Sequence, residues 1–422
     1  MPHYDVLLHD VLSGQIAHDP VQDRSSFRFL EDYRRLPRRP VLGQHFEDDL
    51  RRTHHGKRGA LPPWFANLVP EGALRDLLKR SLGLASDADL PIFAAVGRDL
   101  PGAVEVLPAA TDAGLFSDGS IQEGEGDARD YAETPPQTEL ALRFSLPGVQ
   151  MKFSVLREQE KITLPVQGRL GDWIVKLDSR RFPGLVENEF ATMEWARAAG
   201  LQVPECQIAS LEVLPPALRS YAPDGTSVFL IRRYDREGNR RIHQEDFAQL
   251  VNLPPALKYE QVTYEGCARL ARQIVGPAGY AEVVRRLAFM VASGNMDAHL
   301  KNWSLLYPDD ISAVLSPLYD QVATIAWPDE TTREAALKFA GTKDPFRIDI
   351  AAFTRLAERS GGEVKETIRL VQETIEQTAA AWSTSIAAES MPREHARQLR
   401  DYWRRAPLLK DHLTPGMFTA QA

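Results

Sequence analysis

The sequence is poor in several features that would indicate other classes of protein. Its 422 residues contain two cysteines, Cys206 and Cys267, which are too few for a disulfide framework or a zinc site. No apolar run approaches the roughly 18 to 20 residues that a membrane-spanning helix needs. The start, M-P-H-Y-D-V, lacks the basic and apolar parts of a signal peptide. These absences favour a protein of the reducing cytoplasm that has no membrane partner.

An excess of positive charge is also missing. The formal net charge of −8 opposes nonspecific attraction of the whole surface to nucleic acid. Two basic runs, at 34–39 and 51–58, leave two interpretations open: a solvated face beside acidic residues, or a local patch that contacts phosphates. The length and the 43% apolar content are those of a globular protein with two or three domains.

The most informative segment is S-G-N-M-D-A-H-L-K-N-W-S-L-L at 293–306, which is followed by L-S-P-L-Y-D ending at Asp320. Phosphoryl-transfer enzymes use this spacing of an Asp, an Asn five positions later and a second Asp. Asp297 would accept the proton of the attacking hydroxyl, and Asn302 and Asp320 would hold Mg²⁺ on the phosphates of ATP. Asp297, Lys301 and Asn302 are therefore the predicted catalytic residues.

The surroundings of this segment support that interpretation, because D-x-x-x-x-N alone also occurs in capped loops. Apolar residues recur at helical spacing over 281–293, so Asp297 is expected just beyond the end of a helix that Gly294 terminates. W-S-L-L-Y, the turn P-D-D and I-S-A-V-L predict a hairpin. That hairpin would bring Asp320 beside Asn302.

Upstream, a lysine strand precedes a glutamate helix. Lys176 lies in the short strand W-I-V-K-L, where an ammonium is costly unless it meets a charge. A helix is predicted from about Glu187 and is ended by Gly200. Either Glu187 or Glu189 could face Lys176, and Glu189 is the predicted partner, as in the lysine–glutamate pair of kinases. The alternative is a lysine that reaches solvent from an edge strand.

The predicted organisation is an α+β, two-lobed, protein-kinase-like fold with a small β-rich N-terminal subdomain. Residues 1–108 form that subdomain, 109–138 an exposed linker or insertion, 139–235 the small lobe, and 236–422 a mainly helical large lobe. The run S-V-F-L-I-R-R-Y-D at 227–235 would pass the nucleotide base. Its predicted ATP-binding residues are Phe229, Ile231 and Tyr234.

Several motifs in fixed order resemble those of the HipA-type serine/threonine kinase toxins of bacterial toxin–antitoxin pairs. These motifs are F-A-N-L-V-P-E-G, L-P-G-A-V-E-V, S-L-P-G-V-Q-M-K, W-I-V-K-L, E-N-E-F-A-T-M-E, I-R-R-Y-D-R, H-Q-E-D-F-A-Q-L, L-K-Y-E, N-M-D-A-H-L-K-N-W-S and L-Y-D. They run through almost the whole chain.

The resemblance implies an ATP- and Mg²⁺-dependent protein kinase that phosphorylates a translation component, typically an aminoacyl-tRNA synthetase, and arrests growth. It also implies a helix-turn-helix antitoxin partner that carries the pair to operator DNA. In such proteins the S-x-x-G-x-Q-x-K loop covers the phosphates, and its serine is phosphorylated by the kinase itself. Here that serine is Ser145, and the ATP-binding loop residues are Gly148, Val149, Gln150 and Lys152.

Some features depart from the family or from common kinases. The loop holds one glycine and Pro147, Asn295 and Met296 replace the His-Arg of common protein kinases, and Arg232 stands where family members more often show Glu. Two other functions remain open. One is a non-catalytic, kinase-like corepressor that binds the antitoxin, and the other is a small-molecule kinase.

Overall fold

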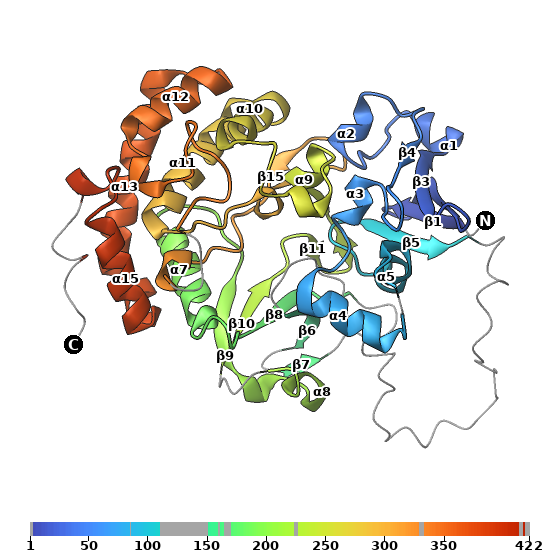
Figure 1. Cartoon of the computed structure of the whole chain (residues 1–422), viewed down its shortest axis with the longest axis horizontal. Coiled ribbons are helices and arrows are strands. Elements are labelled where there is room, and N and C mark those ends of the chain that lie inside the picture. The colour runs from blue at the N-terminus through green and yellow to red at the C-terminus, as the bar shows by residue number, and fades with distance from the viewer. Residues whose placement is uncertain are drawn as a thin grey trace.

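The structure is a computed structural model of the chain, and it describes residues 3–84, 86–109, 151–158, 161–163, 170–222, 227–328, 333–412 and 417. Two five-stranded sheets lie in the N-terminal and middle parts, and most of the longer helices gather in the C-terminal part (Figure 1). The predicted α+β class is confirmed. None of the helices within these residues is long and apolar enough to cross a membrane.

The N-terminal part is built on an antiparallel sheet with the strand order β4-β3-β2-β1-β5. In β1 the buried residues Tyr4, Val6 and Leu8 alternate with less buried ones, so one face of the sheet is apolar. The strands are β1 (His3–Leu8), β2 (Val11–Asp19), β3 (Arg24–Phe29), β4 (His54–His55) and β5 (Val104–Pro108). The helices are α1 (Glu31–Arg34), α2 (Gln44–Glu47), α3 (Pro63–Ala66), α4 (Gly72–Ser81) and α5 (Asp89–Val96).

A second antiparallel sheet, in the order β7-β6-β8-β10-β9, occupies the middle of the chain. Helix α7 (Leu185–Ala198) packs on it and confirms the helix predicted from about Glu187. The strands are β6 (Lys152–Glu158), β7 (Lys161–Thr163), β8 (Trp173–Leu177), β9 (Cys206–Ser210) and β10 (Ser227–Arg232). The short elements η1 (Leu211–Val213) and α8 (Pro216–Arg219) lie between β9 and β10.

Strand β10 is buried on both faces, which explains its continuous apolar run. Val228 and Leu230 belong to a core that the middle sheet shares with the N-terminal part. Phe229 and Ile231 point the other way, into the core formed with α7 and the C-terminal helices. The middle sheet therefore lies between two hydrophobic cores.

The C-terminal part is mainly helical, as predicted. Its helices are α9 (Phe247–Leu250), α10 (Tyr264–Ile274), α11 (Pro277–Ser293), α12 (Ile350–Ser360), α13 (Val364–Thr384), α14 (Ala387–Ser390) and α15 (Arg393–Trp403). Its strands are β11 (Arg236–Glu237), β12 (Arg240–Arg241), β13 (His243–Asp246), β14 (Ser304–Tyr307) and β15 (Val314–Leu315). The 3₁₀ turns among the described residues of this part are η2 (Pro255–Leu257), η3 (Leu300–Asn302), η4 (Thr324–Ala326), η5 (Pro345–Arg347) and η6 (Lys410–His412). Pairing of β14 with β15 confirms the predicted hairpin.

Strand β13 joins the C-terminal part to the N-terminal part. The buried Glu245 carboxylate accepts hydrogen bonds from the Gln44 amide at 2.9 Å, Trp64 Nε1 at 3.0 Å and the Tyr307 hydroxyl at 2.6 Å. Just before β11, the Asp235 carboxylate accepts a hydrogen bond from the Gly102 amide at 2.8 Å. These contacts hold the N-terminal part against the C-terminal part.

His243 gives this junction a pH dependence. Its Nε2 lies 2.8 Å from the Leu42 carbonyl, so Nε2 carries the proton, and Nδ1 accepts from the Ala103 amide at 3.4 Å. Burial lowers the pKa of His243 to about 3; the Leu42 bond opposes this, and the charges of His9 and Asp235 act with opposite signs. A proton on Nδ1 would face the Ala103 N–H. The native state therefore excludes the charged imidazole.

We expect the free energy of unfolding to fall on acidification below pH 6.5. Above that pH the histidine is neutral in both states, and below it the unfolded chain binds a proton that the native chain rejects. The loss is ~1.4 kcal/mol per pH unit for this one group, or about 2 kcal/mol at pH 5. Urea titrations of the wild type and His243→Gln at pH 7 and pH 5 measure it. Between pH 7 and pH 5 the variant should lose correspondingly less unfolding free energy than the wild type. The same replacement at the exposed His55 should leave the wild-type loss unchanged.

Candidate active site

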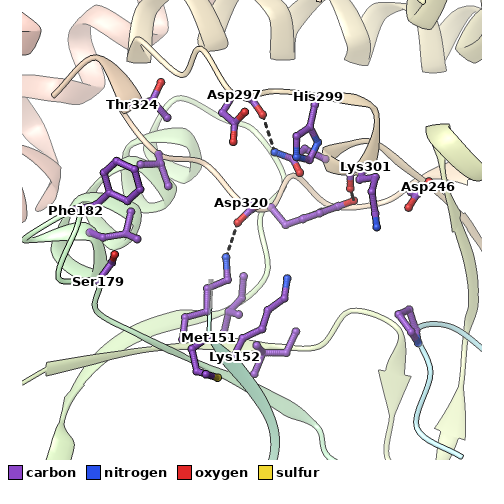
Figure 2. Close-up of a pocket in the computed structure, with 18 of the residues that line it drawn as sticks. Met151, Lys152, Ser179, Phe182, Asp246, Asp297, His299, Lys301, Asp320 and Thr324 are labelled. Atoms are coloured by element: carbon purple, nitrogen blue, oxygen red, sulfur yellow. Dashed lines mark hydrogen bonds and ion pairs between the residues drawn. The ribbon is translucent and has the colours of Figure 1, made fainter. Parts of the chain in front are cut away.

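A cavity of about 890 Å³ lies where the middle sheet faces the C-terminal part. Eight of the predicted site residues line it: Lys152, Lys176, Ile231, Tyr234, Asp297, Lys301, Asn302 and Asp320. In Figure 2 the Lys152 side chain extends from the sheet into the cavity, and Asp297 and Asp320 lie on the opposite wall. The predicted site residues in the cavity thus come from segments up to 168 residues apart in the sequence, from Lys152 to Asp320.

Two lysines reach the cavity from neighbouring strands. Lys152 of β6 and Lys176 of β8 are paired residues in the antiparallel ladder, so their side chains leave the same face of the sheet. Burial and the charge of Lys176 lower the pKa of Lys152 to about 8. Like charges directly opposite each other destabilise a sheet unless an anion lies between them. The pair suits the phosphates of a nucleotide.

Lys176 is held between two carboxylates. Its Nζ lies 2.5 Å from Glu189 Oε1 and 2.6 Å from Asp320 Oδ1. Burial works against its charge, but the two carboxylates raise its pKa above the usual value. Burial in turn raises the pKa of Glu189 to about 7 against the opposing effect of the ammonium. The strand lysine and the helix glutamate thus meet as the sequence predicted, and Glu187 is not the partner.

The turn that carries Asp297 is set by the end of α11. Gly294 ends the helix with a φ of 65°, and a Cβ there would lie 2.4 Å from Ile325 Cγ1. Asn295 then fixes the loop from both sides, because Nδ2 donates to Gln321 Oε1 at 3.0 Å and Oδ1 accepts from the Asp297 amide at 3.1 Å. The Asn that replaces His of common kinases therefore has a structural role here.

Asp297 is accessible from the cavity, and its carboxylate accepts a hydrogen bond from the Tyr259 hydroxyl at 3.0 Å. The protein around it displaces water and raises its pKa to about 6; the Tyr259 bond opposes this rise and the Asp320 charge adds to it. A base with a pKa near the working pH transfers protons most efficiently. The position and the electrostatics of Asp297 both suit a general base.

Asn302 and Asp320 offer oxygen ligands that suit Mg²⁺. The Asn302 side chain donates through Nδ2 to the Asp297 carbonyl at 3.1 Å, so its oxygen is directed elsewhere. Asp320 stays ionised, because the Lys176 ammonium outweighs burial and lowers the pKa of the carboxyl. Its φ of 57° is uncommon for a residue other than glycine, and such conformations concentrate at functional sites. The donor set fits a magnesium ion shared with nucleotide phosphates.

Only part of the strand end that was predicted to lie beside the nucleotide base faces the cavity. Ile231 and Tyr234 line the cavity, whereas Phe229 is fully buried in the core beneath Lys176, with Nζ 5.9 Å from its ring centroid. The amides of Arg232 and Arg233 already donate to the carbonyls of Glu205 and Asp172, at 2.8 and 2.9 Å. These two amides are therefore not available to contact a nucleotide base in this arrangement.

Lys301 lies in the cavity wall but is already engaged. Its Nζ donates to the Asn67 carbonyl at 3.0 Å and forms an ion pair with Glu71, which also binds Lys258 at 2.9 Å. Burial works against the charge of Glu71, but the ammonium groups of Lys301 and Lys258 lower its pKa to about 2. Sequence reasoning missed this cluster and also Tyr259. Their motifs, F-A-N-L-V-P-E-G and L-K-Y-E, had served only for the resemblance.

Four predicted positions lie outside the described residues: Ser145, Gly148, Val149 and Gln150. They stay predictions, as do the catalytic, nucleotide-binding and metal-binding roles of the other residues. The proposed domain boundaries near 108, 138 and 235 likewise stay predictions.

Several known proteins are similar to this chain in sequence and in fold. Residues 4–107 match the family model of the HipA N-terminal domain, and residues 144–382 match the HipA-like C-terminal domain. "Putative kinase Y4dM" of Sinorhizobium fredii is 36% identical over 88% of this chain and 91% of its own length. The serine/threonine-protein kinase toxin HipA of Shewanella oneidensis is 23% identical over 86% of this chain and 89% of its own.

A solved structure from Shewanella oneidensis, of the toxin–antitoxin system HipA, HipB and its operator DNA, superposes with a TM-score of 0.71. It covers 96% of both chains at 19% sequence identity, so it shows the shared fold. The fold is therefore the two-lobed kinase-like fold of HipA, as predicted. By its sequence matches over both domains, the chain belongs to the HipA family.

Proposed function

We propose that the chain is an ATP- and Mg²⁺-dependent serine/threonine protein kinase that acts as the toxin of a toxin–antitoxin pair. The observation that carries the proposal is Lys176, held between Glu189 and Asp320 in the cavity that also contains Asp297. A non-catalytic scaffold has no use for this arrangement. Paired lysine and glutamate together with a metal-binding aspartate are the parts that kinases need for phosphoryl transfer.

The residues divide the work of the reaction. Lys176 and Lys152 would bind the phosphates of ATP, and Asn302 and Asp320 would bind Mg²⁺, which neutralises charge on those phosphates. The acceptor hydroxyl loses its proton to the Asp297 carboxylate as its oxygen bonds to the γ-phosphorus. The bond to the β-phosphate oxygen breaks, and ADP leaves with that electron pair. Tyr259 uses one oxygen of Asp297, so the other is left for the acceptor.

The substrate and partners follow from the family. We propose that a translation component, an aminoacyl-tRNA synthetase, is the protein substrate, which places the kinase in the cytoplasm. The HipA of Shewanella oneidensis was solved with HipB and operator DNA. A helix-turn-helix antitoxin is accordingly proposed to bind this chain and to supply most of the contact with operator DNA.

Incubation of the purified chain with radiolabelled ATP, Mg²⁺ and a cell extract tests the proposed function. A labelled extract protein supports it. A labelled small molecule would indicate a small-molecule kinase instead. No label in either fraction, with the antitoxin still bound, would favour the non-catalytic corepressor.

Ser145 is proposed to be a site of self-inhibition. A phosphoserine carries about −1.5 to −2 charges at pH 7 and, in the motif that ends at Lys152, would repel the phosphates of ATP. We expect phosphopeptide mapping after prolonged incubation with Mg-ATP to find phosphate on Ser145, and Ser145→Asp to lose activity. An unmodified Ser145 together with a fully active Ser145→Asp would refute this regulation and leave the kinase assignment intact.

A further inference from the structure

The loop between α3 and α4 extends from the N-terminal part into the wall of the catalytic cavity. Asn67 and Leu68 of this loop line the cavity, and its end, Glu71, binds the ammonium groups of Lys258 and Lys301. Both lysines are more than 90% buried. The contact joins residues separated by 187 and 230 positions in the chain, so it forms only in the folded protein.

The two lysines belong to the two segments that carry the catalytic groups. Lys258 accepts the Leu300 amide at its carbonyl, at 3.3 Å, and its neighbour Tyr259 donates to Asp297. Lys301 directly precedes Asn302, whose side chain donates to the Asp297 carbonyl. One carboxylate therefore ties together the segment that supports the base and the segment that carries a metal ligand.

Charge explains why this carboxylate matters. Two buried ammonium groups that share one partner repel each other, and they stay buried only while that partner neutralises part of their charge. Without Glu71, the Lys301 ammonium would keep the neutral Asn67 carbonyl as a partner but lose its counter-charge, which favours a turn of the side chain toward solvent in the cavity. Because Lys301 directly precedes Asn302, such a turn would disturb the backbone that positions Asn302.

We propose that Glu71 is a positioning residue of the phosphoryl-transfer site, so that the N-terminal part of the chain completes the active site. The proposal rests on the kinase function proposed above. The proposal gives a function to the motif F-A-N-L-V-P-E-G. No residue of this motif is assigned to nucleotide binding, to metal binding or to the general base. Glu71 acts through Lys258 and Lys301 and does not itself contact the reacting atoms.

The kinetic test compares Glu71→Gln with Glu105→Gln. Glu105 also links the N-terminal part to the C-terminal part, through Arg241 at 3.5 Å, but it does not line the cavity. We expect Glu71→Gln to lower kcat about 10- to 100-fold, as loss of an outer partner does at metal sites, and to change the KM for ATP far less. Glu105→Gln should keep the wild-type kcat. Equal kcat in both variants would overturn the proposal.

A second variant and a second measurement guard against simple misfolding. Glu71→Asp keeps the charge but is one methylene shorter, so it should remain folded and give an intermediate kcat. Mass spectrometry after acetylation with acetic anhydride reports on the lysines without any kinase activity. We expect faster labelling of Lys301 in Glu71→Gln and not in Glu105→Gln. Unchanged labelling would show that Glu71 does not hold Lys301 in its buried position. A wild-type chain that transfers no phosphate would instead contradict the proposed function, on which the labelling does not depend.

Discussion

Replacing Asp297 with Asn should lower the rate of phosphoryl transfer by roughly 10²- to 10⁴-fold, the range attributed to a positioned general base. The amide cannot accept the proton of the acceptor hydroxyl, although it has nearly the same shape as the carboxylate. Because Lys176, Asn302 and Asp320 are untouched, Mg-ATP should still bind. Single-turnover transfer of labelled phosphate measures the rate, and calorimetry measures the binding.

The control for this replacement is Asp309→Asn. Asp309 lies in the exposed turn of the hairpin after Asn302, where it accepts the amides of Ile311 and Ser312 at 3.0 and 2.6 Å. Its loss should leave the transfer rate unchanged. A rate for Asp297→Asn within a few-fold of the wild type would remove Asp297 from the mechanism.

Asp320→Asn is expected to weaken binding of Mg-ATP by more than the roughly 10- to 100-fold that follows loss of an outer partner at a metal site, because a direct ligand is lost. The replacement removes one anionic oxygen from Mg²⁺ and one of the two carboxylates on Lys176. Calorimetric titration with Mg-ATP and with ATP in excess EDTA separates the two contributions. The loss should be large with Mg²⁺ and small without it.

An equal loss under both conditions would show that Asp320 acts only through Lys176, and the metal assignment would then be wrong. The variant should remain folded, because Glu189 still neutralises Lys176 at 2.5 Å. Far-UV circular dichroism and the urea midpoint check this point.

Much of the candidate site could be predicted because its signals are local. The end of α11 at Gly294 follows from apolar periodicity and from the conformational freedom of glycine. The hairpin after Asn302 follows from two apolar runs around P-D-D. The predicted preference for Glu189 over Glu187 is confirmed, but its physical reason, the direction of α7 across the sheet, is seen only in the structure.

Long-range contacts account for what was missed. The pairing of β1 with β5 joins residues about a hundred positions apart, and the sequence of neither strand indicates which strand it pairs with. The engagement of the Arg232 and Arg233 amides depends on loops whose conformation has no sequence period. Glu71 is similar, since a glutamate in solvent and a glutamate that pairs with two buried lysines look alike in a linear sequence.

The sequence by itself determined the chemical groups of this protein and their order: a lysine strand, a glutamate helix, then Asp297, Asn302 and Asp320. It could do so because side-chain chemistry, turn residues and periodicity act over a few neighbouring positions. Only the tertiary structure decided which groups meet. It placed Lys176 between Glu189 and Asp320 and put Glu71 on Lys258 and Lys301. The packing around each group then set its pKa, because burial raises the pKa of Glu189 whereas two ammonium groups lower that of Glu71 against burial.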